Sequence, residues 1–116
     1  MERLWQAVIN SWNGLVAVTR SEAAFRQELA LLAVGVPLAF FLTADVGERF
    51  ALIGVIVFIL IVELLNTAIE KLSDRVTRDH DPAIKHVKDM SSAAVGLSLL
   101  AAGAVWLYVL TGRLWP

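Results

Sequence analysis

Three long apolar segments constrain the fold of this chain more than any other feature of its sequence. They cover residues 29–44, 50–69 and 91–112. They raise the hydrophobic share of the chain to 58%, above the roughly 45–50% that is typical of soluble domains. A helix needs roughly 20 residues to cross the hydrocarbon core of a bilayer. The second and third segments meet this length, and the polar residues that flank the first need only reach the interfaces. We therefore predict three transmembrane helices.

The first apolar segment has a competing interpretation as a secretory signal peptide. Such a peptide would place basic residues directly before the apolar region and small residues at a cleavage site. Here about 28 mostly amphipathic residues precede the segment, which favours a spanning helix. Pro37 lies inside this segment, and a membrane helix tolerates proline when neighbouring groups satisfy the freed carbonyl.

The N-terminal segment 2–20 has an apolar face at helical spacing but is too polar to span a bilayer. The face consists of Leu4, Trp5, Val8, Trp12 and Leu15. Such a helix is expected to lie flat in the membrane interface, and the alternative is a helix packed against protein. Ser21 is a candidate N-cap for the helix that follows.

These patterns predict an all-α membrane protein with one integral-membrane domain over residues 1–116. It comprises a surface helix over 1–20 and transmembrane helices over about 24–45, 49–76 and 84–113. Eight of the ten Lys and Arg residues lie before the first apolar segment (29–44) or between the second (50–69) and the third (91–112). Because positive charge stays on the cytoplasmic side, we expect the N-terminus and the 71–90 loop to be cytoplasmic.

A stripe of polar groups interrupts the second apolar segment. On a helix of 100° per residue, Asn66 lies about 60° behind Glu63, Glu70 about 20° behind it and Asp74 about 20° ahead. A carboxylate in such an apolar segment is costly unless it is paired, metal-bound or facing a polar cavity. A solvated helix end, with Glu63 reaching toward water, is the alternative. Because Glu63 lies within the apolar segment, we favour a functional site over a solvated helix end.

Further polar groups flank the spanning helices on the same side, and each has a plain structural explanation. Glu22 and Arg26 are four residues apart, so they can form a helix-stabilising ion pair. Lys88 can serve as a positively charged membrane anchor. His80, between two aspartates, can ligate a metal or simply be solvated in a loop.

The inventory of carboxylates, one amide and one lysine favours a hard, oxygen-ligated cation such as Mg²⁺. Mg²⁺ is usually bound with substrate phosphates, so a nucleotide is a natural companion. The chain has no cysteine and no Gly-rich phosphate loop, and its net charge of −1 argues against nucleic-acid binding. An enzyme that phosphorylates a membrane-dissolved alcohol fits this inventory. A carboxylate-lined proton or cation transport protein remains the alternative from another class.

Three blocks of the sequence resemble the signature of the prokaryotic diacylglycerol kinase family. They are residues 22–28 (EAAFRQE), 63–70 (ELLNTAIE) followed by Asp74-Arg75, and 88–95 (KDMSSAAV). The resemblance covers nearly the whole chain, and the middle block is the most specific. It implies a homotrimer in the bacterial inner membrane that transfers the γ-phosphoryl group of MgATP directly to the primary hydroxyl of diacylglycerol, giving phosphatidate.

The resemblance also implies roles for individual residues. Glu63 matches the general base of the family, with Asn66 beside it, and Glu22 and Glu70 match its metal-binding glutamates. The positions that match nucleotide contacts are Arg3, Glu22, Glu70, Asp79, His80, Asp81, Lys88 and Asp89. The positions that match the lipid site are Arg26, Gln27, Glu28, Glu63 and Ser92.

The chain departs from the family pattern in one loop. It reads Asp79-His-Asp-Pro82, where relatives often have an aromatic residue and a histidine, so the contacts to adenine are open. A related branch of the family phosphorylates undecaprenol. The first and third blocks are more similar to the diacylglycerol branch.

Overall fold

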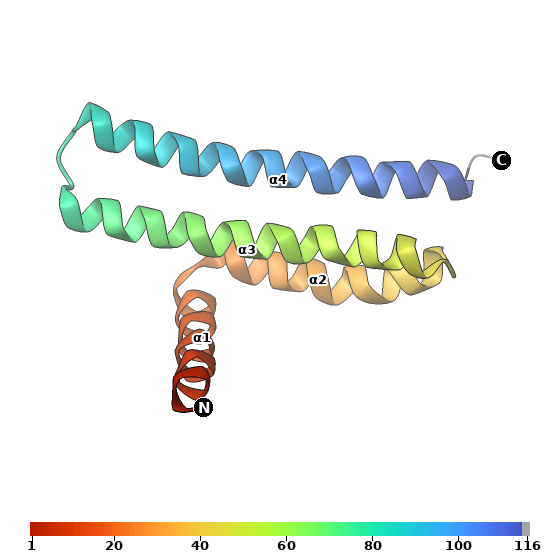
Figure 1. Ribbon diagram of the computed structural model, residues 1–116. Helices are drawn as coiled ribbons and strands as arrows, with labels where there is room; N and C mark the ends of the chain where they lie inside the picture. The colour runs from red at the N-terminus through yellow and green to blue at the C-terminus, as the bar shows by residue number, and fades with distance from the viewer. Residues whose placement is uncertain (115–116) are drawn as a thin grey trace.

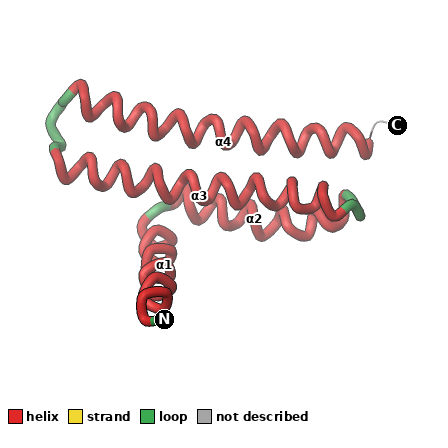
Figure 2. Tube along the Cα trace, viewed as in Figure 1, coloured by secondary structure: helices red, strands yellow, loops and turns green. Residues whose placement is uncertain are grey.

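A computed structural model describes residues 1–114 of the chain, all within or between four α-helices. Helix α1 spans Glu2–Ser21, α2 spans Ala23–Leu42, α3 spans Val46–Val76 and α4 spans Pro82–Leu114. Short links join them, and the described residues contain no strand (Figure 2). The all-α class is confirmed.

Three of these helices run alongside one another, and the first crosses them. Helix α3 packs against both α2 and α4, so it is the central element, whereas α1 extends away from the other three (Figure 1). Helices α2, α3 and α4 are each long and apolar enough to span a bilayer. The three predicted transmembrane helices are therefore confirmed, and helix α2 continues through Pro37.

A single extended residue separates α1 from α2. Glu22 has φ −119° and ψ 116° and occupies the N-cap position of α2 without a side-chain cap, while Ser21 is the last residue of α1. The predicted N-cap at Ser21 is therefore wrong. Arg26 also makes no ion pair with Glu22. Its Nη1 donates to the carbonyls of Thr19 and Arg20, at 2.9 and 3.1 Å, and so satisfies the C-terminal end of α1.

The apolar face of α1 remains open in the isolated chain. Leu4, Trp5, Val8 and Trp12 are all exposed, and Val18 is the only buried residue of the helix. A helix packed against protein would bury this face. Its exposure favours the interfacial interpretation, in which the face lies in the lipid headgroup region.

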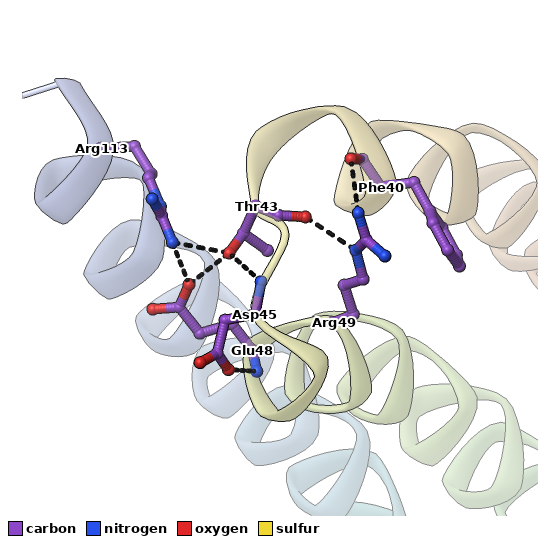
Figure 3. Close-up of polar contacts among 6 residues, drawn as sticks. All are labelled: Phe40, Thr43, Asp45, Glu48, Arg49 and Arg113. Atoms are coloured by element: carbon purple, nitrogen blue, oxygen red, sulfur yellow. Dashed lines mark hydrogen bonds and ion pairs between the residues drawn. The ribbon is translucent and has the colours of Figure 1, made fainter.

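Thr43 anchors a polar cluster at the end of the bundle where α2 turns into α3 (Figure 3). Its hydroxyl contacts the Glu48 carboxylate at 2.5 Å, and the Arg113 Nη2 donates to both, at 2.7 and 2.8 Å. The Asp45 side chain caps α3 by accepting a hydrogen bond from the Glu48 amide at 2.8 Å. This cap starts α3 at Val46, so the predicted range 24–45 runs past the end of α2 and the predicted start at 49 is late.

Arg49 closes the same turn from the other side. Its Nε donates to the carbonyl of Thr43 at 2.7 Å and its Nη2 to that of Phe40 at 3.3 Å. The guanidinium also lies 4.3 Å from the centroid of the Phe40 ring. These contacts satisfy carbonyls that the end of α2 leaves free. Arg49 therefore fastens the turn to α2 and α3, and Arg113 joins it to the end of α4.

Close packing in the middle of the bundle depends on a glycine. A Cβ atom on Gly35 would lie 2.5 Å from Ile56 Cδ1 and 3.6 Å from Trp106 Cζ2. Small residues allow helices in lipid to approach closely. The Trp106 Nε1 donates to the Leu52 carbonyl at 3.1 Å, which ties α4 to α3 at this level.

We predict that Gly35→Val destabilises the protein by about 1–3 kcal/mol, because a branched side chain overpacks the contact between α2 and α3. Thermal unfolding in detergent, followed by circular dichroism, measures the loss. Gly54→Val is the matched control, since a Cβ atom placed at Gly54 meets nothing within 4 Å beyond its chain neighbours and the backbone of its own helix. Equal losses in the two variants would contradict the packing role of Gly35.

Candidate functional site

The Glu63 carboxylate lies where α1, α2 and α3 meet. Glu63 is only 6% exposed. A cluster of Val18, Phe25 and Leu60, with Leu64 packed against it, brings the end of α1 and the start of α2 onto this part of α3. Each of the three helices contributes an apolar side chain, so the acid is enclosed by hydrocarbon. Burying a charged carboxylate in this way costs free energy unless other groups pair with it or form hydrogen bonds to it.

Further carboxylates gather around this position. Glu22, from the link between α1 and α2, and Glu70, two turns along α3, both lie close enough to act on the charge of Glu63. Glu28 on α2 interacts with Glu63 in the same way. The Oε1 atom of Glu28 is buried and has no hydrogen-bond partner. The structure therefore unites four acids that the sequence places in two separate blocks.

Asn66 joins this cluster to α4. The Ser91 hydroxyl donates to the Asn66 Oδ1 atom at 2.7 Å, and the Asn66 side chain lies close enough to Glu63 to act on its charge. Asn66 is half-buried and Ser91 is buried. Since Ser91 fixes the Asn66 oxygen, the amide nitrogen of Asn66 remains available as a donor to a carboxylate.

Lys88 forms the second cross-link between α3 and α4. Its Nζ atom lies 2.7 Å from Asp74 Oδ1, and both side chains are partly exposed. The neighbouring Asp89 is paired with Lys85, also at 2.7 Å. Asp74 lies about 16 Å from Glu63 along the axis of α3. The Lys88 ammonium is therefore not beside the buried acid in a single chain.

The loop between α3 and α4 contains the three residues that the resemblance assigns to nucleotide binding. Asp81 caps α4, since its Oδ1 accepts hydrogen bonds from the amides of Ala83 and Ile84 at 2.9 and 3.2 Å. The Asp79 amide donates to the Thr77 hydroxyl at 3.0 Å. His80 is exposed. Of these three side chains, that of Asp81 therefore has a structural role as the cap of α4.

The remaining predicted site residues lie outside the buried cluster. Arg3 is exposed near the free end of α1 (Figure 1), about 28 Å along that helix from Glu22. Gln27, Arg26 and Ser92 are exposed. Within one chain the structure does not bring Arg3 to the acids.

The carboxylates suit a hard divalent cation, although they do not form a complete cage. Within residues 1–114, no group of three or more His, Asp or Glu side chains is arranged to hold a metal ion. Mg²⁺ does not require such a cage, because it is usually bound by one or two carboxylates together with phosphates and water. Glu22 and Glu70 supply two carboxylates near Glu63. The donor set therefore fits a metal that arrives with a phosphorylated ligand.

Sequence reasoning did not identify two partners in this site. Ser91 carries no signal of its own, since it lies in a run of small residues and its partner is far away in sequence. Asp74 lies on the predicted polar stripe, but the pattern does not indicate its pairing with Lys88. Helical periodicity places residues on one face of their own helix and says nothing about the helix opposite.

Comparison with known proteins gives a consistent result over nearly the whole chain. The family model for prokaryotic diacylglycerol kinase matches residues 9–110. A diacylglycerol kinase of Pseudomonas aeruginosa is 43% identical over 112 residues, covering 97% of this chain and 91% of that protein. That of Escherichia coli K12 is 38% identical over 108 residues, covering 93% and 88%. That of Helicobacter pylori J99 is 35% identical over 111 residues, covering 95% and 87%.

The hydrogen bond between Ser91 and Asn66 gives a prediction about stability. We expect Ser91→Ala to destabilise the protein by about 1 kcal/mol, the scale of an interhelical hydrogen bond in a membrane protein. Ser98→Ala is the control, because the Ser98 hydroxyl donates to the Val95 carbonyl of its own helix at 2.7 Å. Unfolding in detergent, titrated with a denaturing surfactant, compares the two. A loss confined to Ser98→Ala would show that the interhelical bond contributes nothing.

Proposed function

The chain belongs to the prokaryotic diacylglycerol kinase family and is a membrane lipid kinase, and from this premise we propose its reaction and the roles of its residues. The proposed reaction transfers the γ-phosphoryl group of ATP in line to the primary hydroxyl of a diacylglycerol, giving phosphatidate. Glu63 acts as the general base. The observation that carries this proposal is a carboxylate buried in a membrane-spanning helix, with the acids Glu22, Glu28 and Glu70 around it.

Glu63 is suited to accept the proton of a lipid hydroxyl. It is shielded from water and lies at the level of an apolar cluster, an environment that suits the approach of a lipid alcohol. Transfer of that proton makes the hydroxyl oxygen a better nucleophile. The Asn66 amide, held by Ser91, keeps the carboxylate in position.

We propose that Glu22 and Glu70 hold the divalent cation that accompanies ATP, and that this cation is Mg²⁺. When bound, such an ion neutralises charge on the transferred phosphoryl group. The two glutamates fix the phosphates close to Glu63, which brings nucleophile and phosphorus together. Lys88 and Asp89 contribute to nucleotide binding on the same side, and we assign Arg3, Asp79, His80 and Asp81 to the outer part of the nucleotide on the family resemblance.

The lipid site lies on α2 beside Glu63 in this proposal. The Glu28 Oε1 atom, buried without a partner, is an acceptor available to a glycerol hydroxyl or to water next to it. Arg26 and Gln27 precede it on the same helix, and Ser92 on α4 faces outward. These residues contact the polar part of the lipid, while its chains remain in the bilayer.

We propose that the protein lies in the bacterial inner membrane with its N-terminus and the 71–90 loop in the cytoplasm. The distribution of Lys and Arg supports this orientation, and ATP is available on that side. Membership of a kinase family favours this function over a proton or cation transport protein. Undecaprenol is the alternative acceptor, and it is tested by the same assay.

The division of roles predicts different kinetic defects. Glu63→Gln should lower kcat by about 10²–10⁴-fold, because general-base catalysis is lost, and leave the KM for MgATP nearly unchanged. Glu22→Gln and Glu70→Gln should raise that KM. The assay uses purified protein in bicelles with MgATP and either diacylglycerol or undecaprenol. Equal increases in KM with an unchanged kcat in all three variants would refute these assignments.

We further propose that the active protein is a homotrimer with sites shared between protomers. Within one chain the Lys88 ammonium is paired with Asp74, about 16 Å along α3 from Glu63, and Arg3 is farther still. The small residues Ala93, Ala94 and Gly96 of α4 are exposed and offer a surface for close packing between protomers. A neighbouring chain can then supply Lys88 to the site of Glu63.

Subunit mixing tests this sharing. Glu63→Gln and Lys88→Met proteins, each inactive alone, should recover activity when their subunits are exchanged in equal amounts. If neighbouring chains supply the two residues, about a quarter of the interfaces of a cyclic trimer carry both intact, so about a quarter of wild-type activity is expected. An inactive mixture, with exchange verified by a tagged subunit, would mean that each chain builds its own site.

A further inference from the structure

A groove of about 400 Å³ lies between the second half of α1 and the second half of α3. Its walls are mainly apolar and include Gly14, Ala17 and Val18 from α1 and Leu64 and Ala68 from α3. Val18 and Leu64 also belong to the apolar cluster around Glu63. The groove is therefore continuous with the surroundings of the proposed base.

Thr67 is the unusual residue of this groove. It lines the groove, is 5% exposed, and its Oγ1 atom is buried without a hydrogen-bond partner. Buried hydroxyls are normally paired. Four other hydroxyls in these helices donate to a carbonyl of the preceding turn, namely those of Ser11, Thr19, Ser98 and Thr111. Thr67 does not, so it presents a donor that a ligand can use.

The surroundings of Thr67 indicate what kind of acceptor it would meet. The other polar side chains that line the groove are Ser21 and Lys71, and a phosphate would need more positive charge than one lysine provides. A neutral acceptor attached to hydrocarbon fits better. An ester carbonyl has this character, since it joins a polar oxygen to an acyl chain.

We infer that the Thr67 hydroxyl donates a hydrogen bond to an ester carbonyl of the diacylglycerol whose primary hydroxyl meets Glu63. This inference rests on the proposed function. Thr67 lies one turn beyond Glu63, about 6 Å along the axis of α3. In diacylglycerol, only two glycerol carbons and one ester oxygen separate the primary hydroxyl from the neighbouring carbonyl carbon. One lipid can therefore reach both side chains.

This contact makes Thr67 a specificity residue. A site built to donate a hydrogen bond to its substrate discriminates against an analogue that lacks the acceptor, because the donor is then buried unpaired. An isoprenoid alcohol has no ester carbonyl and leaves Thr67 unsatisfied. The carbonyl enters between α1 and α3. The Thr67 Oγ1 atom is covered in the single chain, and a shift of α1, which buries only Val18, would uncover it.

The test compares two acceptors on full-length protein in bicelles, a diester diacylglycerol and the dialkyl glycerol diether with chains of equal length. Thr67→Val removes the hydroxyl with little change in shape. It should lower kcat/KM for the diester by about three- to tenfold, the size of one hydrogen bond, and change that for the diether less than twofold. Thr67→Ser keeps the donor and should retain the preference for the diester. Thr111→Val is the matched control, since the Thr111 hydroxyl is satisfied within α4.

The inference is overturned if Thr67→Val loses the same factor on both lipids, which indicates a structural role. It is also overturned if Thr67→Val raises the KM for MgATP equally with the diester and the diether. The group that accepts the Thr67 hydrogen bond would then be a phosphate of the nucleotide. Thr67→Ala replaces the valine variant if the latter does not fold. Wild-type protein that phosphorylates no diacylglycerol at all would refute the proposed function instead, so the two failures are distinguishable.

Discussion

The burial of the Glu63 carboxylate within a membrane-spanning helix is the constraint on which the rest of the structure depends. An acid in an apolar setting needs partners, because neither lipid nor hydrocarbon side chains can solvate its charge. Asn66 on α3 supplies a polar amide beside the acid, and Ser91 holds Asn66 from α4. Glu22 and Glu28 instead add like charge around Glu63, which a bound cation would offset. A site of this kind requires every helix of the bundle to be in register.

Polar contacts at both ends of the bundle maintain that register. At one end, the Arg113 guanidinium binds Thr43 and Glu48, which ties the end of α4 to the turn between α2 and α3 (Figure 3). Toward the other end, Lys88 binds Asp74. Between them α3 and α4 are tied by apolar packing and by the bond from Trp106 to the Leu52 carbonyl. With both ends joined, sliding of α4 along α3 is opposed, and Ser91 stays opposite Asn66.

The junction of α1 and α2 connects the membrane interface to the buried acid. The link consists of Glu22 alone, and Arg26 fastens the last turn of α1 through two backbone carbonyls. As a result the surface helix crosses α3 next to Glu63 and forms the groove that contains Thr67. A reaction between a nucleotide in water and an alcohol in lipid needs a site at this boundary. The geometry of one short link therefore determines where the two substrates can meet.

Much of this protein follows from its sequence alone. The three spans could be predicted because a backbone in lipid must satisfy its own hydrogen bonds, so long apolar segments become helices. The stripe of Glu63, Asn66 and Glu70 could be predicted because helical periodicity is local. The tertiary structure alone decided that Ser91 rather than Ser92 contacts Asn66, that Lys88 pairs with Asp74, and that Arg26 binds carbonyls of α1 instead of Glu22. These pairings depend on how each helix is rotated and shifted against its neighbour, and that is determined by side chains that pack across the bundle from distant parts of the chain.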